Sequence, residues 1–186
     1  RVSGLEQNED FRALGELLEG LRAIVAAELR LASEGKIAKV ELGPVFDNVR
    51  IVVEPSFQQA AAEIVWQIPP KLPSVWAEAQ GLTQVFLNLC QNSCRVLETA
   101  SRRLLTITAS VEPTRVVVKL QDTGPGISDP DRLFQAFQEG ATMTGMGLYV
   151  SRAIIRSFGG KLQHEASEPG ACFVIELVRA DEGIGA

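Results

Sequence analysis

An apolar run that ends in an acidic residue and two closely spaced glycines most constrains what this chain can fold into. Residues 116–120 read Val-Val-Val-Lys-Leu and lead directly into Gln121-Asp122-Thr123-Gly124-Pro125-Gly126-Ile127. The run predicts a buried strand that places Asp122 at its carboxyl end. Glycine lets a backbone turn with positive φ and approach another group closely. The segment therefore predicts a fixed carboxylate beside a close-approach loop, which suits a ligand that carries an amino group.

Two other interpretations of this segment are open when it is taken alone. The same residues would form a tight turn with a capping Asp. Asp122-Thr123-Gly124 also matches the catalytic turn of aspartic proteases, where two carboxylates share a proton, and a single copy would then need a dimer. Choosing among these three interpretations requires the other motifs of the chain.

The composition is ordinary for a globular protein and narrows the class of function. The chain has 186 residues, is 46% hydrophobic and 22% charged, and carries a net charge of −5. This acidic balance argues against general nucleic-acid binding, for which a basic patch is expected. No apolar run reaches the roughly 18 residues typical of a membrane-spanning helix, so we expect no membrane segment in this fragment.

The chain contains three cysteines, Cys90, Cys94 and Cys172, and a single histidine, His164. So sparse and odd a set of cysteines does not predict a disulfide framework and favours a reducing compartment. No histidine joins Cys90 and Cys94, so small buried side chains are favoured over a zinc site. We expect a cytoplasmic location for the fragment, whether or not a longer parent protein is anchored in a membrane.

Hydrophobic periodicity predicts the order of the elements. Residues 11–33 are predicted to form a long helix with coiled-coil spacing, which either needs a partner helix or packs on its own domain; its apolar positions are Leu14, Leu17, Leu21, Ile24 and Leu31. A loop is expected at 42–45 and a short helix before Pro55. The remaining elements are a strand at 61–68, a helix at 78–99, strands at 104–111 and 114–121, a flexible segment at 140–147, a helix at 148–158, and strands at 161–165 and 171–178.

The predicted helix at 82–98 is apolar around most of its circumference but has one narrow polar stripe. At about 100° per residue, the stripe holds Gln84, Asn88, Gln91, Asn92 and Arg95. A solvated stripe is usually rich in Lys and Glu, whereas amides with an Arg suit a binding site. An Asn oxygen can ligate Mg²⁺ and an Arg can hold phosphate oxygens. A solvent face that happens to be amide-rich is the alternative.

A second glycine cluster, Thr144-Gly145-Met146-Gly147-Leu148, lies at the start of a predicted helix. The free N–H groups and positive dipole end of a helix N-terminus form a phosphate site. The cluster is not a P-loop, because no Gly-Lys-Ser/Thr ends it. It is not a dinucleotide-binding fingerprint, because Val150 occupies the place of the third glycine.

Taken together, the amide helix, the Asp122 loop, an aromatic patch and the second glycine cluster resemble the N, G1, F and G2 boxes of the sensor histidine kinase catalytic domain. That domain belongs to the GHKL ATPase superfamily, and the resemblance covers about residues 40–178. It implies an α+β fold, a two-layer α/β sandwich with ATP between the helices and a mobile lid. By the same resemblance, residues 1–35 match the C-terminal part of a dimerisation helical hairpin, 36–180 the ATP-binding catalytic domain and 181–186 a flexible tail. A homodimer through residues 11–33 is implied.

The resemblance also implies a role for each matching residue. Asp122 resembles the residue that binds the adenine amino group, with Gly124, Gly126 and Ile127 lining the base pocket. Asn92 resembles the Mg²⁺-binding Asn, and Arg95 takes the place of a phosphate-contacting Lys. Phe134 and Phe137 belong to a segment that resembles the lid-anchoring F box, and the phosphate loop is matched by Thr144, Gly145, Met146, Gly147 and Leu148.

Asn88 bears on the mechanism, because hydrolytic members of the superfamily carry a Glu there as general base for water. An amide cannot take a proton at neutral pH. With Asn88, Asn92 and Arg95 as catalytic residues, the resemblance implies transfer of the ATP γ-phosphate to a histidine, and from that phosphohistidine to a response regulator. His164 does not match the acceptor, so we expect that this fragment does not autophosphorylate.

Two alternatives to a kinase core follow from the same residues. Residues 138–144, in the expected lid, contain no Lys or Arg. This absence motivates a nucleotide-gated dimerisation or binding module that transfers no phosphate. A hydrolytic ATPase is the other alternative, and Asn88 argues against it.

Overall fold

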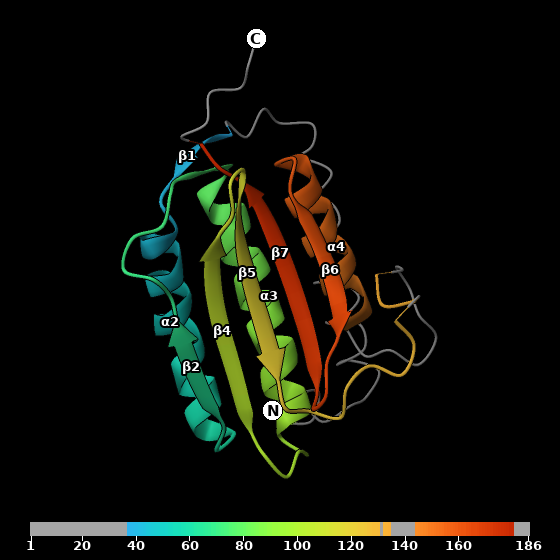
Figure 1. Cartoon of the computed structure of the whole chain (residues 1–186). Helices are drawn as coiled ribbons and strands as arrows, with labels where there is room; N and C mark the ends of the chain where they lie inside the picture. Colours follow the sequence, from blue (N-terminus) through green and yellow to red (C-terminus); the bar gives the residue numbers. More distant parts are fainter. Residues whose placement is uncertain (1–36, 131, 135–143, 181–186) are drawn as a thin grey trace, which may run out of the picture.

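The computed structural model describes residues 37–130, 132–134 and 144–180, with side chains given from residue 147 onward in the last range. Within these residues, a five-stranded sheet and three helices form two layers, and the three helices lie on one face of the sheet (Figure 1). The helices are α2 (Leu42–Gln59), α3 (Ala79–Leu97) and α4 (Thr144–Ser157). The predicted two-layer α/β sandwich is confirmed.

The sheet is mixed, with strands in the order β2-β4-β5-β7-β6. Its strands are β2 (Glu63–Gln67), β4 (Leu104–Val111), β5 (Arg115–Asp122), β6 (Lys161–Ala166) and β7 (Ala171–Val178). Only the pair of β2 and β4 is parallel, and the other neighbours are antiparallel. A separate two-stranded ribbon pairs β1 (Ala38–Val40) with β3 (Val75–Ala77). The strand β5, which carries Asp122, therefore lies at the centre of the sheet.

The core lies between the sheet and the helices. Alternate residues of the central strands face the helices and are almost completely buried, among them Leu105, Ile107, Val118, Leu120 and Ile175. Helix α3 contributes Leu82, Val85, Phe86 and Leu89, all of them 0% exposed. Each fully buried side chain of this size stabilises a fold by about 1.5–3 kcal/mol. This burial fixes α3 against the sheet and with it the position of the polar stripe.

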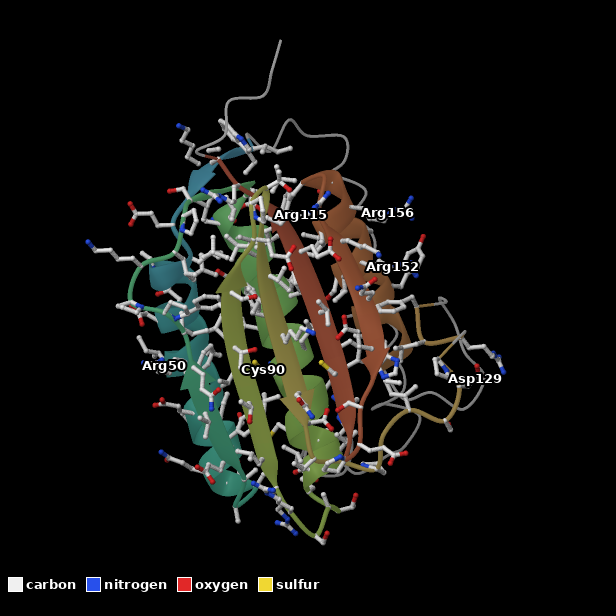
Figure 2. All side chains as sticks on the ribbon, viewed as in Figure 1. Arg50, Cys90, Arg115, Asp129, Arg152 and Arg156 are labelled. Carbon is white, nitrogen blue, oxygen red and sulfur yellow. The ribbon has the colours of Figure 1, made fainter. Side chains whose placement is uncertain are left out.

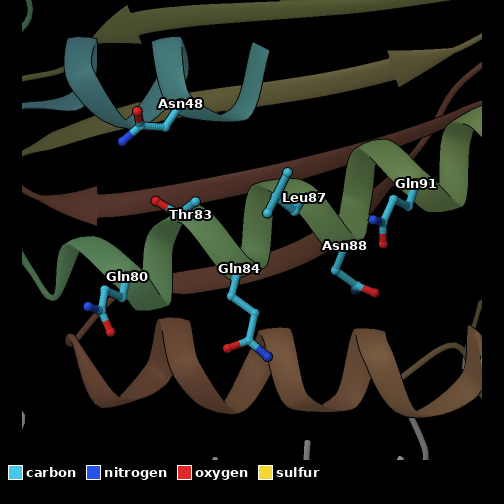
Figure 3. A pocket seen from close by; sticks show the side chains of 7 residues that line it. All are labelled: Asn48, Gln80, Thr83, Gln84, Leu87, Asn88 and Gln91. Atoms are coloured by element: carbon cyan, nitrogen blue, oxygen red, sulfur yellow. The ribbon is translucent and has the colours of Figure 1, made fainter. Parts of the chain in front are cut away.

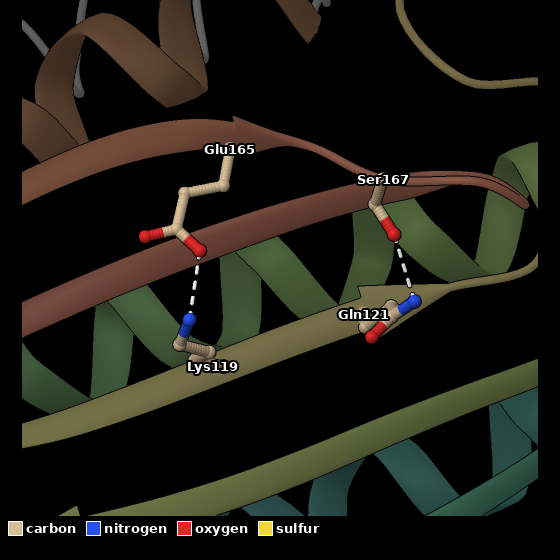
Figure 4. A network of polar contacts seen from close by, with 4 residues as sticks. All are labelled: Lys119, Gln121, Glu165 and Ser167. Carbon is tan, nitrogen blue, oxygen red and sulfur yellow. Dashed lines mark hydrogen bonds and ion pairs between the residues drawn. The ribbon is translucent and has the colours of Figure 1, made fainter.

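The opposite face of the sheet is polar and carries no helix in the described part of the chain (Figure 4). Lys119 Nζ lies 2.7 Å from Glu165 Oε2, and Gln121 Nε2 donates to Ser167 Oγ at 2.7 Å. A small apolar cluster is nevertheless buried on this face, formed by Val117, Cys172 and Val174. Long polar side chains therefore shield the face from water without a second layer.

Helix α2 differs from the sequence prediction of a loop at 42–45 and a short helix. It runs without interruption for 18 residues and includes Pro44 and Pro55. Pro44 falls in the first turn, where a backbone N–H has no partner within the helix. Pro55 is exposed, and burial of Val49, Val53 and Phe57 holds the helix through it. Packing thus overrides a local helix breaker.

Other differences concern short elements. Residues 144–147, predicted as part of a flexible segment at 140–147, form the first turn of α4. Strands β1 and β3, each of three residues, were not predicted. Residues 140–143, the predicted helix at 11–33 and the predicted tail at 181–186 lie outside the described residues, so those predictions and the domain boundaries remain predictions.

Cys90 and Cys94 are buried, as expected for small core side chains, and Cys172 is buried as well. Burial raises the pKa of the Cys90 thiol to about 12. Among the described helices, none combines the length and the apolar character required to cross a membrane.

Candidate functional site

Asp122 is a buried carboxylate whose oxygens are held by several elements. It ends β5 and is 2% exposed. Its Oδ1 accepts hydrogen bonds from the backbone N–H groups of Gly124, at 2.9 Å, and Ala171, at 3.1 Å. Its Oδ2 accepts one from the hydroxyl of Ser93, at 3.2 Å. A buried charge is tolerated only when it is hydrogen-bonded in this way. The structure therefore places a preformed acceptor at the end of the central strand.

The loop after Asp122 is anchored to the neighbouring strand. Thr123 Oγ1 donates to the carbonyl of Arg102 at 2.6 Å, and the N–H of Leu104 donates to Thr123 Oγ1 at 3.0 Å. Gly126 has the predicted positive φ, at 80°, whereas Gly124 is not among the residues with positive φ. A Cβ at Gly124 would lie 3.0 Å from Asp122 Oδ1. Glycine is therefore required at Gly126 by its backbone conformation and at Gly124 by the close approach of the Asp122 side chain.

Several residues that surround Asp122 were not predicted from the sequence. Gly170 has a φ of 86°, and a Cβ there would overlap the backbone carbonyl of Asp122. A Cβ at Gly124 would lie 3.0 Å from Val96 Cγ2, a side chain of α3 that is 38% exposed. A Pro-Gly pair such as Pro169-Gly170 is typical of a turn, but no local signal shows that this turn packs against β5. Ser93 was hidden among the apolar residues of its helix.

The polar stripe predicted on α3 exists. Glu78 caps the N-terminus of the helix by accepting from the N–H groups of Gln80 and Gly81. Asn88 and Asn92 are half-buried, and Arg95 is exposed in the last turn. The stripe therefore stays accessible while the rest of α3 packs on the sheet.

Asn88 is engaged by α4. Its Nδ2 donates to the hydroxyl of Ser151 at 3.0 Å, and Ser151 is only 2% exposed. A Cβ at Gly147 would overlap the Asn88 side-chain amide, so α4 approaches α3 closely at this glycine. The N-terminal part of α4 is thus brought against the polar stripe. Leu148, the next residue, is 6% exposed in the core.

Asn92 differs from Asn88, because its buried side-chain nitrogen has no hydrogen-bond partner among the described residues. A buried polar atom without a partner is costly and calls for an explanation. Because an amide nitrogen is a donor, a ligand acceptor such as a phosphate oxygen would satisfy it. The described residues contain no group of three or more His, Cys, Asp or Glu side chains that could hold a metal ion by themselves. One Asn oxygen fits Mg²⁺ when waters and substrate phosphates complete its shell.

The described part of the aromatic segment packs against the domain. Ile127, Leu133 and Phe134 are partly buried against the core. The guanidinium of Arg152, labelled on α4 in Figure 2, lies 4.6 Å from the centre of the Phe134 ring. This cation–π contact ties the segment to α4. Phe137 lies outside the described residues, as do the side chains of Thr144, Gly145 and Met146.

A groove with a volume of about 600 Å³ lies over the exposed face of α3. Figure 3 shows Asn48 reaching in from α2, while Gln84 and Asn88 point toward α4. The described residues that line it are all uncharged: Asn48, Gln80, Thr83, Gln84, Leu87, Asn88 and Gln91. Of the predicted site residues that the structure describes, only Asn88 lines it. The groove therefore borders the predicted site without containing it.

Comparison with known proteins agrees with this geometry. A family model described as "Histidine kinase-, DNA gyrase B-, and HSP90-like ATPase" matches residues 77–181. The Adaptive-response sensory-kinase SasA of Prochlorococcus marinus subsp. pastoris is 32% identical over 145 residues, which cover 73% of this chain and 38% of that protein. This chain thus spans little more than a third of the length of that relative.

Solved structures share the fold. The catalytic domain of histidine kinase ThkA superposes with a TM-score of 0.67 at 25% identity, covering 77% of this chain and 96% of that domain. Full-length ShkA in complex with AMPPNP superposes with a TM-score of 0.72 at 26% identity, covering 92% of this chain and 38% of that one. The fold, the family model and the sequence relatives agree, and the chain belongs to the histidine kinase-, DNA gyrase B- and HSP90-like ATPase family.

Proposed function

We propose that this chain is the ATP-binding catalytic core of a two-component sensor histidine kinase. One observation supports the proposal: two consecutive residues of α3, Asn92 and Ser93, lie at two different parts of the proposed nucleotide site. Ser93 reaches Asp122, the acceptor proposed for the adenine amino group, while the buried side-chain nitrogen of Asn92 has no partner among the described residues. Ser93 contacts the proposed base-binding carboxylate, and the preceding residue, Asn92, offers a nitrogen that can donate to a phosphate and an oxygen that can ligate Mg²⁺. This arrangement suits a nucleoside triphosphate carrying Mg²⁺.

In this proposal each end of the site binds a different part of ATP. Asp122 accepts from the adenine amino group, and Gly124, Gly126 and Ile127 line the base pocket. Mg²⁺, when bound, would neutralise phosphate charge, and Asn92 would supply one oxygen ligand to it. Arg95, exposed at the end of α3, makes no ion pair with another described residue and would hold phosphate oxygens. The complex of ShkA with AMPPNP supports an adenine nucleotide as the ligand.

The same residues favour phosphoryl transfer over hydrolysis of ATP. Asn88 cannot act as a general base, and its amide is hydrogen-bonded to Ser151. Positioning and charge neutralisation would then carry the reaction, with a histidine on another polypeptide segment as acceptor. His164 does not suit that role, because it lies on β6 with its ring against Phe173, at 6.1 Å between ring centres.

Partners and location follow from the proposed kinase role. A response regulator would receive the phosphate, and residues 11–33 would form the homodimer. The three free cysteines support a cytoplasmic location. A nucleotide-gated binding module is not favoured, since the curated relative SasA is named as a kinase.

Titration with a non-hydrolysable ATP analogue, with and without Mg²⁺, tests the nucleotide site. We expect Mg²⁺-dependent binding in the parent chain. Asp122→Asn keeps the shape but replaces an acceptor by an amide, and should raise Kd roughly 10- to 150-fold, equivalent to about 1.5–3 kcal/mol. Unchanged affinity in calorimetry would refute the adenine role of Asp122.

Phosphotransfer needs a separate experiment. The chain is mixed with ATP, Mg²⁺ and a separately produced dimerisation hairpin that carries a histidine. We expect phosphohistidine on the hairpin and none on the chain itself. Binding of ATP without any transfer to the hairpin would instead favour the binding-module alternative.

A further inference from the structure

Ser93 makes an unusual contact for a serine inside a helix. It is 2% exposed, and its hydroxyl donates to Asp122 Oδ2, 29 residues away in the sequence. The hydroxyls of Thr83 and Ser157 instead donate to carbonyl groups of their own helices, at 2.9 Å and 2.7 Å. Serine and threonine within helices commonly bond to the preceding turn in that way. Ser93 therefore gives up the local bond for one that joins two elements.

The two oxygens of Asp122 are held differently. Backbone N–H groups of Gly124 and Ala171 occupy Oδ1. Ser93 is the donor recorded for Oδ2 among the described residues. An ionised carboxylate oxygen accepts more than one hydrogen bond, so Oδ2 keeps capacity for a ligand. Rotation about the last torsion of an Asp side chain is broad, and contacts at Oδ1 alone would restrict it less than contacts at both oxygens.

We propose that Ser93 is a positioning residue for base recognition: it orients Asp122 Oδ2 toward a ligand amino group and thereby favours 6-aminopurine nucleotides. This inference rests on the proposed nucleotide-binding function. The carboxylate offers only acceptor sites, so the group that meets Oδ2 has to be a donor. A purine without the 6-amino group leaves that acceptor unpaired in a buried site, which lowers affinity.

The test compares two nucleotides with two proteins, using the whole 186-residue chain. Kd is measured at fixed Mg²⁺ for ATP and for purine riboside 5′-triphosphate, which lacks the 6-amino group. We expect the parent to prefer ATP by roughly 10- to 150-fold. In Ser93→Ala this preference should fall by about fivefold, because a net hydrogen bond is lost, while the Kd of the purine riboside nucleotide stays within about twofold.

Matched variants separate positioning from a general loss of structure. Thr83→Ala removes a hydroxyl from the same helix without touching Asp122 and should keep the parent preference. Ser93→Cys has a similar size and only a weak donor, so it should reduce the preference as Ser93→Ala does. It provides the measurement if Ser93→Ala does not unfold cooperatively.

Each remaining outcome counts against a definite statement. An undiminished preference for ATP in both Ser93 variants would overturn the role of Ser93 alone. Equal affinity of the parent for the two nucleotides would overturn amino-group recognition at Asp122. A parent chain that binds neither nucleotide would overturn the proposed function, and this inference with it.

Discussion

The two ends of the proposed site differ in how many hydrogen bonds their polar side chains make within the protein. At the base end, Asp122 accepts three hydrogen bonds, from Ser93 on α3, from Gly124 in the loop after β5, and from Ala171 on β7. At the phosphate end, the buried side-chain nitrogen of Asn92 has no partner among the described residues. The residues at the base end are therefore held by the fold itself, and we expect them to contribute to the free energy of unfolding as well as to ligand binding. The phosphate end keeps polar atoms available, and we expect its residues to contribute mainly when ligand is bound. The difference shows that one end of a binding site can be held by hydrogen bonds within the protein while the other end keeps a polar group without a partner.

The largest expected effect concerns Gly170, whose positive φ and contact with the Asp122 carbonyl leave no room for a side chain. Gly170→Ala should lower the free energy of unfolding by about 3 kcal/mol, from backbone strain and overpacking together. Chemical denaturation measures this loss. Gly43→Ala is the matched control, since a Cβ there meets nothing within 4 Å, and should change stability by less than about 1 kcal/mol. An equal loss of stability in the two variants would show that the close packing of Gly170 on Asp122 does not contribute to the stability of the fold.

A direct test of the comparison replaces one residue at each end. Asp122→Ala should cost at least about 2 kcal/mol of stability without nucleotide, since a buried donor left unpaired costs about 1–3 kcal/mol. Asn92→Ala should change stability by less than about 0.5 kcal/mol, because its nitrogen has no partner to lose among the described residues. Denaturation of both variants without ligand gives the two values.

Removal of Mg²⁺ completes that test. In the parent, chelation of Mg²⁺ should weaken binding of the ATP analogue, and in Asn92→Ala it should have little further effect. A variant that still responds to Mg²⁺ as the parent does would show that Asn92 is not the metal ligand. A large loss of stability in Asn92→Ala would show instead that the phosphate end is also part of the built fold.

A smaller effect is expected where α4 meets the polar stripe. Asn88→Ala should cost about 0.5–1.5 kcal/mol through loss of the bond to Ser151. Gly147→Ala should also destabilise, because the new Cβ overlaps the Asn88 amide. In the double variant the overlap is absent, so the two losses should not add, with a coupling energy of about 0.5–1.5 kcal/mol. Strict additivity in a double-mutant cycle would show that Asn88 and Gly147 do not determine the approach of α4.

Local patterns predicted much of the fold and the polar stripe of α3, while the roles of the site residues stay predictions. The alternation in 61–68 and the paired runs at 104–121 became strands because side chains alternate across a sheet, and the amide stripe of α3 stayed accessible because the other positions of the helix are apolar. The short strands β1 and β3 were not predicted, because three residues are too few to show an alternation of apolar and polar side chains. The prediction that a short helix ends before Pro55 was wrong, because burial of other residues of α2 stabilises the helix through a proline on its exposed face.

By itself, the sequence determined the order of the main elements, the apolar and polar faces of α3, and the place of an acid at the end of a strand, because these depend on residues near one another in the chain. Only the tertiary structure decided that Ser93 meets Asp122, that Gly170 packs on the same carboxylate, and that Asn88 meets Ser151. These pairs lie tens of residues apart, and no local periodicity encodes their contact. Packing of the helices on the sheet brings them together.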